Sequence, residues 1–284
     1  LEAHPEVADY ATTTTSRQLQ AQIEREESGL PKSIRTLQAA LREHDAYFGR
    51  QHVSTANLLN SLAIAYQNNN DTDLADAAFN DAWTVYGALG LRDSAGALLT
   101  LGNWATVAFR KNDFAAAEER LKRASTLRRE LYGPSAALAA MQANLGKVML
   151  RARRPDEAMP LLLDSLAMSR EFTGEQSPLT VALLQSLTEA HLLRGELDLA
   201  EGQLVLAREA ARAHSGEDQV LYALCDGMEA RLQMARGNHA RALELANLMA
   251  GKFDALGDAG KPYQPEVLRL RGELNAGAAA AADR

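Results

Sequence analysis

Residues 60–82 read NSLAIAYQNNNDTDLADAAFNDA, and this stretch decides the fold because it predicts two helices joined by a short polar turn. The turn runs from Asn68 to Asp71, and small and apolar residues recur at helical spacing on both sides of it. Such spacing places the small side chains on one face of each helix. We therefore expect an antiparallel helix pair in which these two faces meet.

The predicted helix pair recurs along the chain with a period of about 42 residues, which is typical of a repeat array. In six successive units a small residue stands near the start of the second helix, and the interval never varies by more than one position: Ser33, Ala75, Ala117, Ala158, Ala200 and Ala242. A second series of small residues runs through the first helices: Ala63, Ala105, Gly146, Thr188 and Ala230. The two series together indicate an array of helical repeats.

The small residues have a steric purpose. Two helices approach to about 8–10 Å only where the side chains at their crossing are small. A single pair cannot bury its own apolar stripe, so neighbouring pairs must stack. The sequence therefore predicts an all-α, right-handed superhelical array of about six antiparallel helix pairs, followed by a C-terminal capping helix.

A known family shows the same pattern of residues. The spacing of six residues resembles the tetratricopeptide repeat: Leu62, Ala63, Tyr66, Ala75, Phe79 and Ala82. The period here is longer than the usual one of about 34 residues. It is similar to that of the kinesin light chain subtype, whose linker is echoed in Tyr132-Gly133-Pro134. The resemblance covers about residues 3–274 and implies a tetratricopeptide repeat solenoid, such as the repeat region of a bacterial signalling protein.

The period also sets the expected domain organisation. We expect a single repeat domain over residues 1–284, with units at approximately residues 3–49, 50–90, 91–133, 134–174, 175–216 and 217–257. Residues 262–276 are expected to form a solvent-facing cap rich in Arg and Glu, and residues 277–284 a tail. The first unit is longer than the others, and we place its extra residues around Thr12–Thr15. Because the chain begins directly on a repeat linker, we interpret it as a piece of a larger protein.

Composition limits the classes of partner. A net charge of −7 argues against a nucleic-acid binder, which would show a basic face. No apolar run approaches the ~18 residues of a membrane-spanning helix, so direct membrane insertion is not expected. The single cysteine, Cys225, excludes an internal disulfide and leaves the localisation unknown. A cytoplasmic location fits, as does a periplasmic one if the chain is fused to a membrane kinase.

No motif for catalysis, metal binding or cofactor binding is present. The six histidines are scattered without metal-ligand spacing, and neither glycine-rich phosphate-binding motif occurs. We therefore expect no catalytic residues, no metal and no cofactor in this chain. A longer protein could still carry an enzyme domain.

The family resemblance implies where a partner binds. In this family the first helix of each pair lines the concave face, and the corresponding positions form a candidate partner-binding groove: Asn57, Asn60, Ile64, Asn103, Thr106, Arg110, Asn144, Lys147, Arg151, Gln185 and Glu189. Side-chain amides can hydrogen-bond a peptide backbone whatever its sequence, and the cations favour an acidic segment. The alternative is ordinary solvation of an exposed polar face. The cluster Arg151, Arg153 and Arg154 is also expected to face solvent at a helix end.

Two classes of function follow from these observations. The first is a protein-interaction scaffold that binds a protein or peptide segment, within a larger bacterial signalling protein such as a serine/threonine kinase. The second is the small-ligand or signalling-peptide sensor domain of a transcription regulator. An open groove would favour the scaffold, and an enclosed apolar pocket would favour the sensor. A homodimer is compatible with either class.

Overall fold

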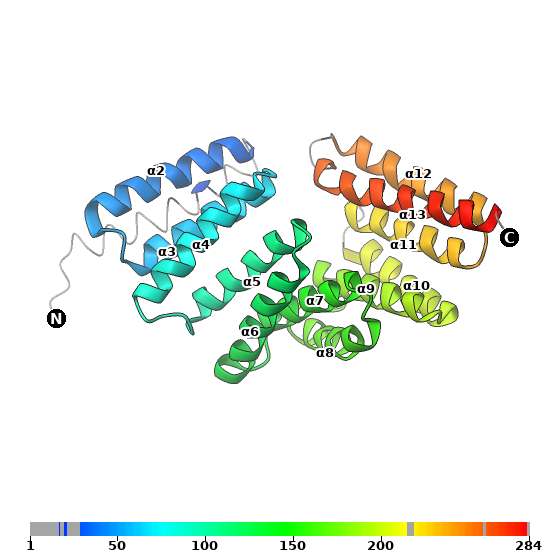
Figure 1. Ribbon diagram of the computed structural model, residues 1–284, viewed down its shortest axis with the longest axis horizontal. Helices are drawn as coiled ribbons and strands as arrows, with labels where there is room; N and C mark the ends of the chain where they lie inside the picture. The colour runs from blue at the N-terminus through cyan, green and yellow to red at the C-terminus, as the bar shows by residue number, and fades with distance from the viewer. Residues whose placement is uncertain (1–16, 18–19, 22–28, 215–218, 258–259, 283–284) are drawn as a thin grey trace. The chain divides into compact units, whose positions relative to one another are not determined.

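The computed structural model describes residues 17, 20–21, 29–214, 219–257 and 260–282, and it confirms the predicted all-α fold (Figure 1). Within these ranges the chain forms the α-helices α2 to α13 and a short 3-10 helix, with no strand. The expected irregularity at Thr12–Thr15 lies outside the described residues. No described helix is both long enough and apolar enough to cross a membrane.

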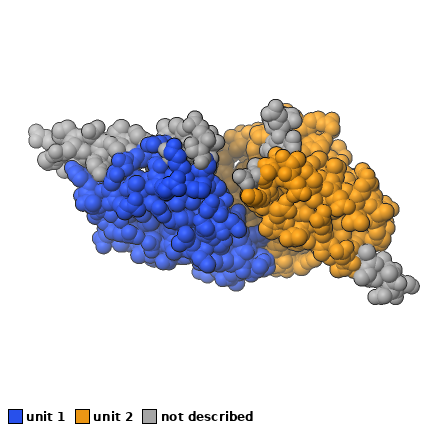
Figure 2. Space-filling model, turned by 90° about the horizontal axis from the view of Figure 1, so that it is seen from above, with its two compact units in different colours: residues 1–132 blue, residues 133–284 orange. Residues whose placement is uncertain are grey.

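The chain divides into two compact units, residues 1–132 and 133–284, which Figure 2 colours blue and orange. Unit 1 contains the second helix of the first pair and two complete pairs: α2 (Leu30–Phe48), α3 (Val53–Asn68), α4 (Thr72–Ala88), α5 (Ala95–Arg110) and α6 (Phe114–Tyr132). Each of these helices packs on the next one along the chain, and the first helices α3 and α5 also touch each other.

Unit 2 contains three pairs and the cap. Its elements are α7 (Ala136–Arg151), α8 (Pro155–Thr173), α9 (Pro178–Arg194), α10 (Leu197–His214), α11 (Gln219–Ala235), α12 (His239–Ala255), η2 (Lys261–Tyr263) and α13 (Gln264–Ala282). The first helices are α7, α9 and α11. They pack side by side, and α13 packs on both α11 and α12. We refer to the surface formed by α7, α9 and α11 as the first-helix face of unit 2.

The turn inside each pair has the same backbone geometry in every described repeat. One residue adopts a positive φ at each turn: Asn70 (67°), Asn112 (60°), Arg153 (59°), Gly195 (74°) and Gly237 (81°). The next amide then donates to the carbonyl five residues earlier, as from Asp71 N to Tyr66 O at 2.9 Å. This is the Schellman arrangement, which satisfies the free carbonyls at a helix end. It reverses the chain within a few polar residues, as the 68–71 turn predicted.

The two series of small residues lie where helices cross. Ala75, Ala117, Ala158, Ala200 and Ala242 are all fully buried. In the first helices Ala63, Ala105 and Ala230 are equally buried. At Gly146 a Cβ atom would stand 2.6 Å from Leu162 Cδ2 on α8, which leaves no room for a larger side chain. The predicted register of both series therefore agrees with the packing.

Helix α13 closes the apolar core of unit 2. Val267, Leu270 and Leu274 are buried in one cluster with Phe253 and Met249 of α12. Leu268, on the same helix, is 67% exposed. The predicted cap is therefore present, and its buried stripe follows positions 267, 270 and 274.

Candidate functional site

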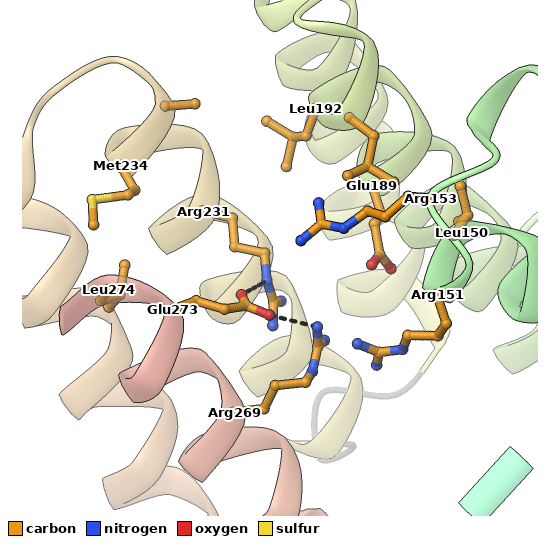
Figure 3. Close-up of a pocket in the computed structure, with 12 residues that line it drawn as sticks. Leu150, Arg151, Arg153, Glu189, Leu192, Arg231, Met234, Arg269, Glu273 and Leu274 are labelled. Carbon is orange, nitrogen blue, oxygen red and sulfur yellow. Dashed lines mark hydrogen bonds and ion pairs between the residues drawn. The ribbon is translucent and has the colours of Figure 1, made fainter. Parts of the chain in front are cut away.

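A pocket of about 450 Å³ opens on the first-helix face of unit 2, beside α13 (Figure 3). Helices α7 (with the turn that follows it), α9, α11 and α13 contribute equally to its lining: Leu150, Arg151, Arg153, Glu189, Leu192, Leu193, Arg231, Met234, Ala235, Arg269, Glu273 and Leu274. Arg153 belongs to the turn after α7. The pocket thus lies on the first helices, where the family resemblance placed the binding face.

Glu266 of α13 is held by three arginines next to this pocket. Both of its carboxylate oxygens accept from Arg269, at 3.0 Å from Nε and 2.6 Å from Nη2. Arg231 Nη2 donates to Oε1 at 2.8 Å, and Arg151 Nη2 lies 3.4 Å from Oε2. Burial alone would raise the pKa of Glu266, but the hydrogen bonds from Arg269 and the charge of Arg231 outweigh it and lower that pKa to about 2.

A second carboxylate of α13 completes the network. Glu273 accepts from Arg231 Nε at 2.8 Å and from Arg269 Nη1 at 2.6 Å (Figure 3). Arg231 therefore binds both glutamates of α13 from α11. These charge-assisted bonds fix α13 on the first-helix face, so that its charged side forms one wall of the pocket.

Positive charge remains after these pairs are made. Arg231 Nη1 is buried and has no hydrogen-bond partner among the described residues, and the side chain as a whole is only 12% exposed. The four arginines that line the pocket stand against Glu189 and Glu273 of its lining and against the adjacent Glu266, so these seven groups carry an excess of one positive charge. Lys147 on α7 lies outside the lining. Figure 3 shows the guanidinium groups of Arg151, Arg153, Arg231 and Arg269 directed into the same space. Such a site attracts an anion.

The rest of the lining is apolar. Leu192 and Leu193 come from the last turn of α9, and Met234 and Ala235 come from the end of α11. Leu274 lies on the same side as Met234, whereas Leu150 lies beside Arg153 (Figure 3). The pocket is therefore mixed, with a cationic side and an apolar side, as is common in sites for small organic ligands.

The structure brings some of the predicted unit 2 residues to the pocket and leaves others away from it. Arg151 and Glu189 line it. Burial lowers the pKa of Lys147, an effect that the charge of Glu189 opposes and that of Arg151 reinforces. Asn144 lies half-buried on α7, away from the lining. Gln185 is buried, and its Nε2 donates to Leu221 O at 3.1 Å, so its amide joins α9 to α11.

In unit 1 the predicted asparagines make contacts between helices. Asn57 Oδ1 accepts from the Tyr86 hydroxyl at 2.7 Å, which ties α3 to α4. Asn60 Oδ1 lies 3.5 Å from Asn103 Nδ2, so these two amides face each other across α3 and α5. Asn57 is nevertheless exposed and the other two are half-buried, so all three remain candidates for partner contact.

The other predicted residues of unit 1 also connect α3 with α5. The Gln67 amide donates to Thr106 Oγ1, which in turn donates to the Asn103 carbonyl at 2.7 Å. Arg110 is exposed and donates from Nη1 to Gln67 O at 2.9 Å. Ile64 is half-buried against the core of the α3–α4 pair. Polar side chains of the predicted groove therefore hold the neighbouring first helices α3 and α5 together.

The expectation that the charged side of the cap faces solvent requires correction. Glu266, Arg269 and Glu273 are only 21%, 30% and 35% exposed in their side chains. Arg269 and Glu273 follow Glu266 by three and seven positions, so all three side chains lie on one face of the helix. That face of α13 is turned towards the pocket. Arg153 is exposed at a helix end, as expected, and it also lines the pocket from the turn that its positive φ creates.

Sequence reasoning missed Arg231, although the repeat period contains a signal for it. The predicted groove residues Ile64, Thr106, Lys147 and Glu189 occupy the same register position in four successive repeats. One further step of the same length from Glu189 leads to Arg231. The register position was therefore available, and the structure shows that it carries the central arginine of the pocket.

Comparisons with known proteins agree with this fold. Residues 96–171 match the tetratricopeptide repeat family model. The solved structure of apo RapI is 13% identical, with 93% of this chain and 99% of that chain covered and a TM-score of 0.66. A Rap protein complexed with competence and sporulation factor is 16% identical, with 92% and 75% covered and a TM-score of 0.64.

A third similar structure carries the repeats that the sequence resembled. It is a putative kinesin light chain from Podosopora anserina with nearly identical tetratricopeptide-like repeats, 17% identical, with 74% of this chain and 98% of that chain covered and a TM-score of 0.59. No curated protein matches the chain by sequence.

The fold and its repeated helix pairs define an α-helical solenoid. The repeat period, the family match and the similar solved structures agree on the type of repeat. The chain therefore has the fold of a tetratricopeptide repeat solenoid, and its residues 96–171 match that family.

Proposed function

We propose that this chain is a non-catalytic interaction module that binds a protein or peptide segment on the first-helix face of unit 2. The observation that carries the proposal is the pocket on α7, α9 and α11, where cationic and apolar side chains converge. The similar Rap structures include complexes with competence and sporulation factor and with the Phr* peptide, which supports a peptide as the class of partner.

The charges on this face favour an acidic segment. Lys147 and Arg151 lie one turn apart on α7, and the exposed Arg153 adds a third cation from the turn that follows this helix. A positive surface on a chain of net charge −7 steers acidic segments towards it and repels basic ones. Contacts at a partly exposed surface are individually modest, so we expect micromolar, salt-sensitive binding. The wider context that we propose is a larger bacterial signalling protein, such as a serine/threonine kinase.

A second candidate function is sensing of a small ligand or signalling peptide within a transcription regulator. The mixed, partly enclosed pocket favours it, because a volume of about 450 Å³ falls within the range of small-molecule sites. One similar structure is a Rap conjugation gene regulator in complex with the Phr* peptide. A scaffold would bind several acidic segments, whereas a sensor would select one ligand.

Charge reversal on α7 tests the proposal. The double variant Lys147→Glu, Arg151→Glu is expected to weaken binding to acidic peptides on an array by about tenfold or more, because two attractive charges become repulsive. The matched control is Arg170→Glu, Arg241→Glu, which reverses two exposed cations on the second helices α8 and α12.

Arg151 also contacts Glu266, so the fold of each variant must be verified by circular dichroism and thermal melting. Acidic-peptide binding that persists in a folded double variant would contradict the proposed face. An equal loss in the control would indicate a general effect of net charge.

A further inference from the structure

We propose that the pocket of unit 2 binds a small organic monocarboxylate, with its single carboxylate on the arginine side and a compact apolar body on the leucine side. This inference rests on the second candidate function and deepens it by naming the chemical class of the ligand, and it requires no protein partner. It rests on one hydrogen-bond donor in the pocket that has no partner among the described residues, on the charge balance of the pocket and on its apolar lining.

The unused donor is on Arg231. Its Nε and Nη2 are bound to Glu273 and Glu266, both at 2.8 Å, while Nη1 is buried without a hydrogen-bond partner among the described residues. A buried unpaired donor is costly, and a ligand oxygen would relieve that cost. Arg153 supplies a second cation to the same space from the turn after α7 (Figure 3).

The charge balance favours one negative group over several. Glu266 and Glu273 already neutralise much of the charge of Arg231 and Arg269, and Glu189 stands on the opposite wall. The remaining excess of one positive charge matches a monoanion. A second ligand carboxylate would have to approach these three glutamates, and like charges at close range repel.

The apolar side selects the body of the ligand. Leu192, Leu193, Met234 and Leu274 line the pocket from three helices, and Figure 3 shows Met234 and Leu274 on the side away from Arg151. Methionine is an adaptable contact for apolar groups of differing shape. A carboxylate without an apolar body would leave this wall in contact with water, so acetate should bind far more weakly than an aryl-substituted acid.

The competing possibility is that α13 is itself the occupant and leaves when a ligand arrives. Its displacement would break the ion pairs of Glu266 with Arg151 and Arg231 and that of Glu273 with Arg231. It would also expose Val267, Leu270 and Leu274, which are 2%, 0% and 5% exposed. A single carboxylate cannot compensate for both losses. Helix α13 therefore remains docked and serves as the fourth wall of the site.

The test uses 4-phenylbutyrate as the probe, with its neutral amide, the dianion phenylsuccinate and acetate as comparisons. Isothermal titration of the full chain is expected to show that the acid binds at least tenfold more tightly than each of the three others. A short peptide with one Glu beside a Leu, acetylated and amidated at its ends, tests whether a peptide side chain supplies the carboxylate instead of a free acid. Tighter binding of that peptide than of phenylbutyrate would overturn the small-acid assignment.

Two variants locate the site. Arg153→Asn removes one cation and keeps the turn, because Asn70 and Asn112 occupy the equivalent positive-φ positions of other repeats. Ala235→Trp fills the pocket from an exposed position at the end of α11 without altering its charge. Each is expected to weaken phenylbutyrate binding by about fivefold or more, whereas Arg170→Gln on α8 should leave it unchanged. Equal binding of acid and amide, stronger binding of phenylsuccinate, or unchanged binding in both pocket variants would overturn the proposal.

Discussion

Replacing Phe253 with alanine is expected to lower the free energy of unfolding of unit 2 by about 3–5 kcal/mol, as for other fully buried aromatic residues. The Phe253 side chain is 0% exposed and belongs to the cluster that joins α12 to α13. Its ring also stacks on Tyr263, with the ring centroids 5.0 Å apart and the planes 11° from parallel. Its removal would leave a cavity at the point where the cap is held.

The measurement is urea denaturation followed by circular dichroism, with Leu248→Ala as the matched control. Leu248 lies on the same helix but is 48% exposed, so its loss should change stability by less than about 1 kcal/mol. Because repeat stability is approximately a sum of local terms, α12 and α13 should unfold before the other helices of unit 2. Similar losses in the two variants would show that the cap does not depend on this core.

Acidification is expected to remove about 3 kcal/mol of stability through Glu266 alone. Its pKa is lowered from 4.5 to about 2 in the folded chain, and each pKa unit corresponds to about 1.4 kcal/mol. A lowered folded-state pKa stabilises the fold above the unfolded value of 4.5. That contribution is lost as the pH falls from about 4.5 towards 2, because the carboxylate must then be protonated.

Thermal melting between pH 6 and pH 2 measures this contribution. In Glu266→Gln the corresponding part of the pH dependence should be absent, because the glutamine does not titrate. Glu244→Gln is the control, since Glu244 forms an exposed pair with Arg241 on α12 and should leave the slope unchanged. Identical pH profiles in the native chain and Glu266→Gln would show that the arginine network does not stabilise the docked cap.

The helix pairs could be predicted because their determinants are local and repeated. Small residues recur at the positions where two helices cross, as at Ala75, Ala117 and Ala158, because only a small side chain fits there. The polar turn at residues 68–71 predicted a chain reversal that the structure repeats with the same positive φ at Asn112 and Arg153. These signals lie within one repeat of the sequence, so they can be interpreted without knowing which distant residues are in contact.

The pocket could not be predicted in full because it depends on long-range docking. Arg151 and Glu266 are 115 positions apart, and nothing in the sequence pairs them before α13 is placed on α11. The exposure of the cap's charged side was misjudged for that reason. Gln185 differs from its prediction in the other direction. Its place in the repeat predicted contact with a partner, but its amide donates a hydrogen bond to α11 inside the fold.

Methionine methyl NMR tests the central claim, that the first-helix face of unit 2 is the binding surface, most directly. Met234 lines the pocket at the end of α11, whereas Met159 lies half-buried on the second helix α8. The protein labelled at its methionine methyl groups would be titrated with the acidic peptide that binds best on the array. The account predicts a saturable shift of the Met234 signal with Met159 unmoved. A shift of Met159 with Met234 unmoved would contradict it and would place the binding surface on the second helices.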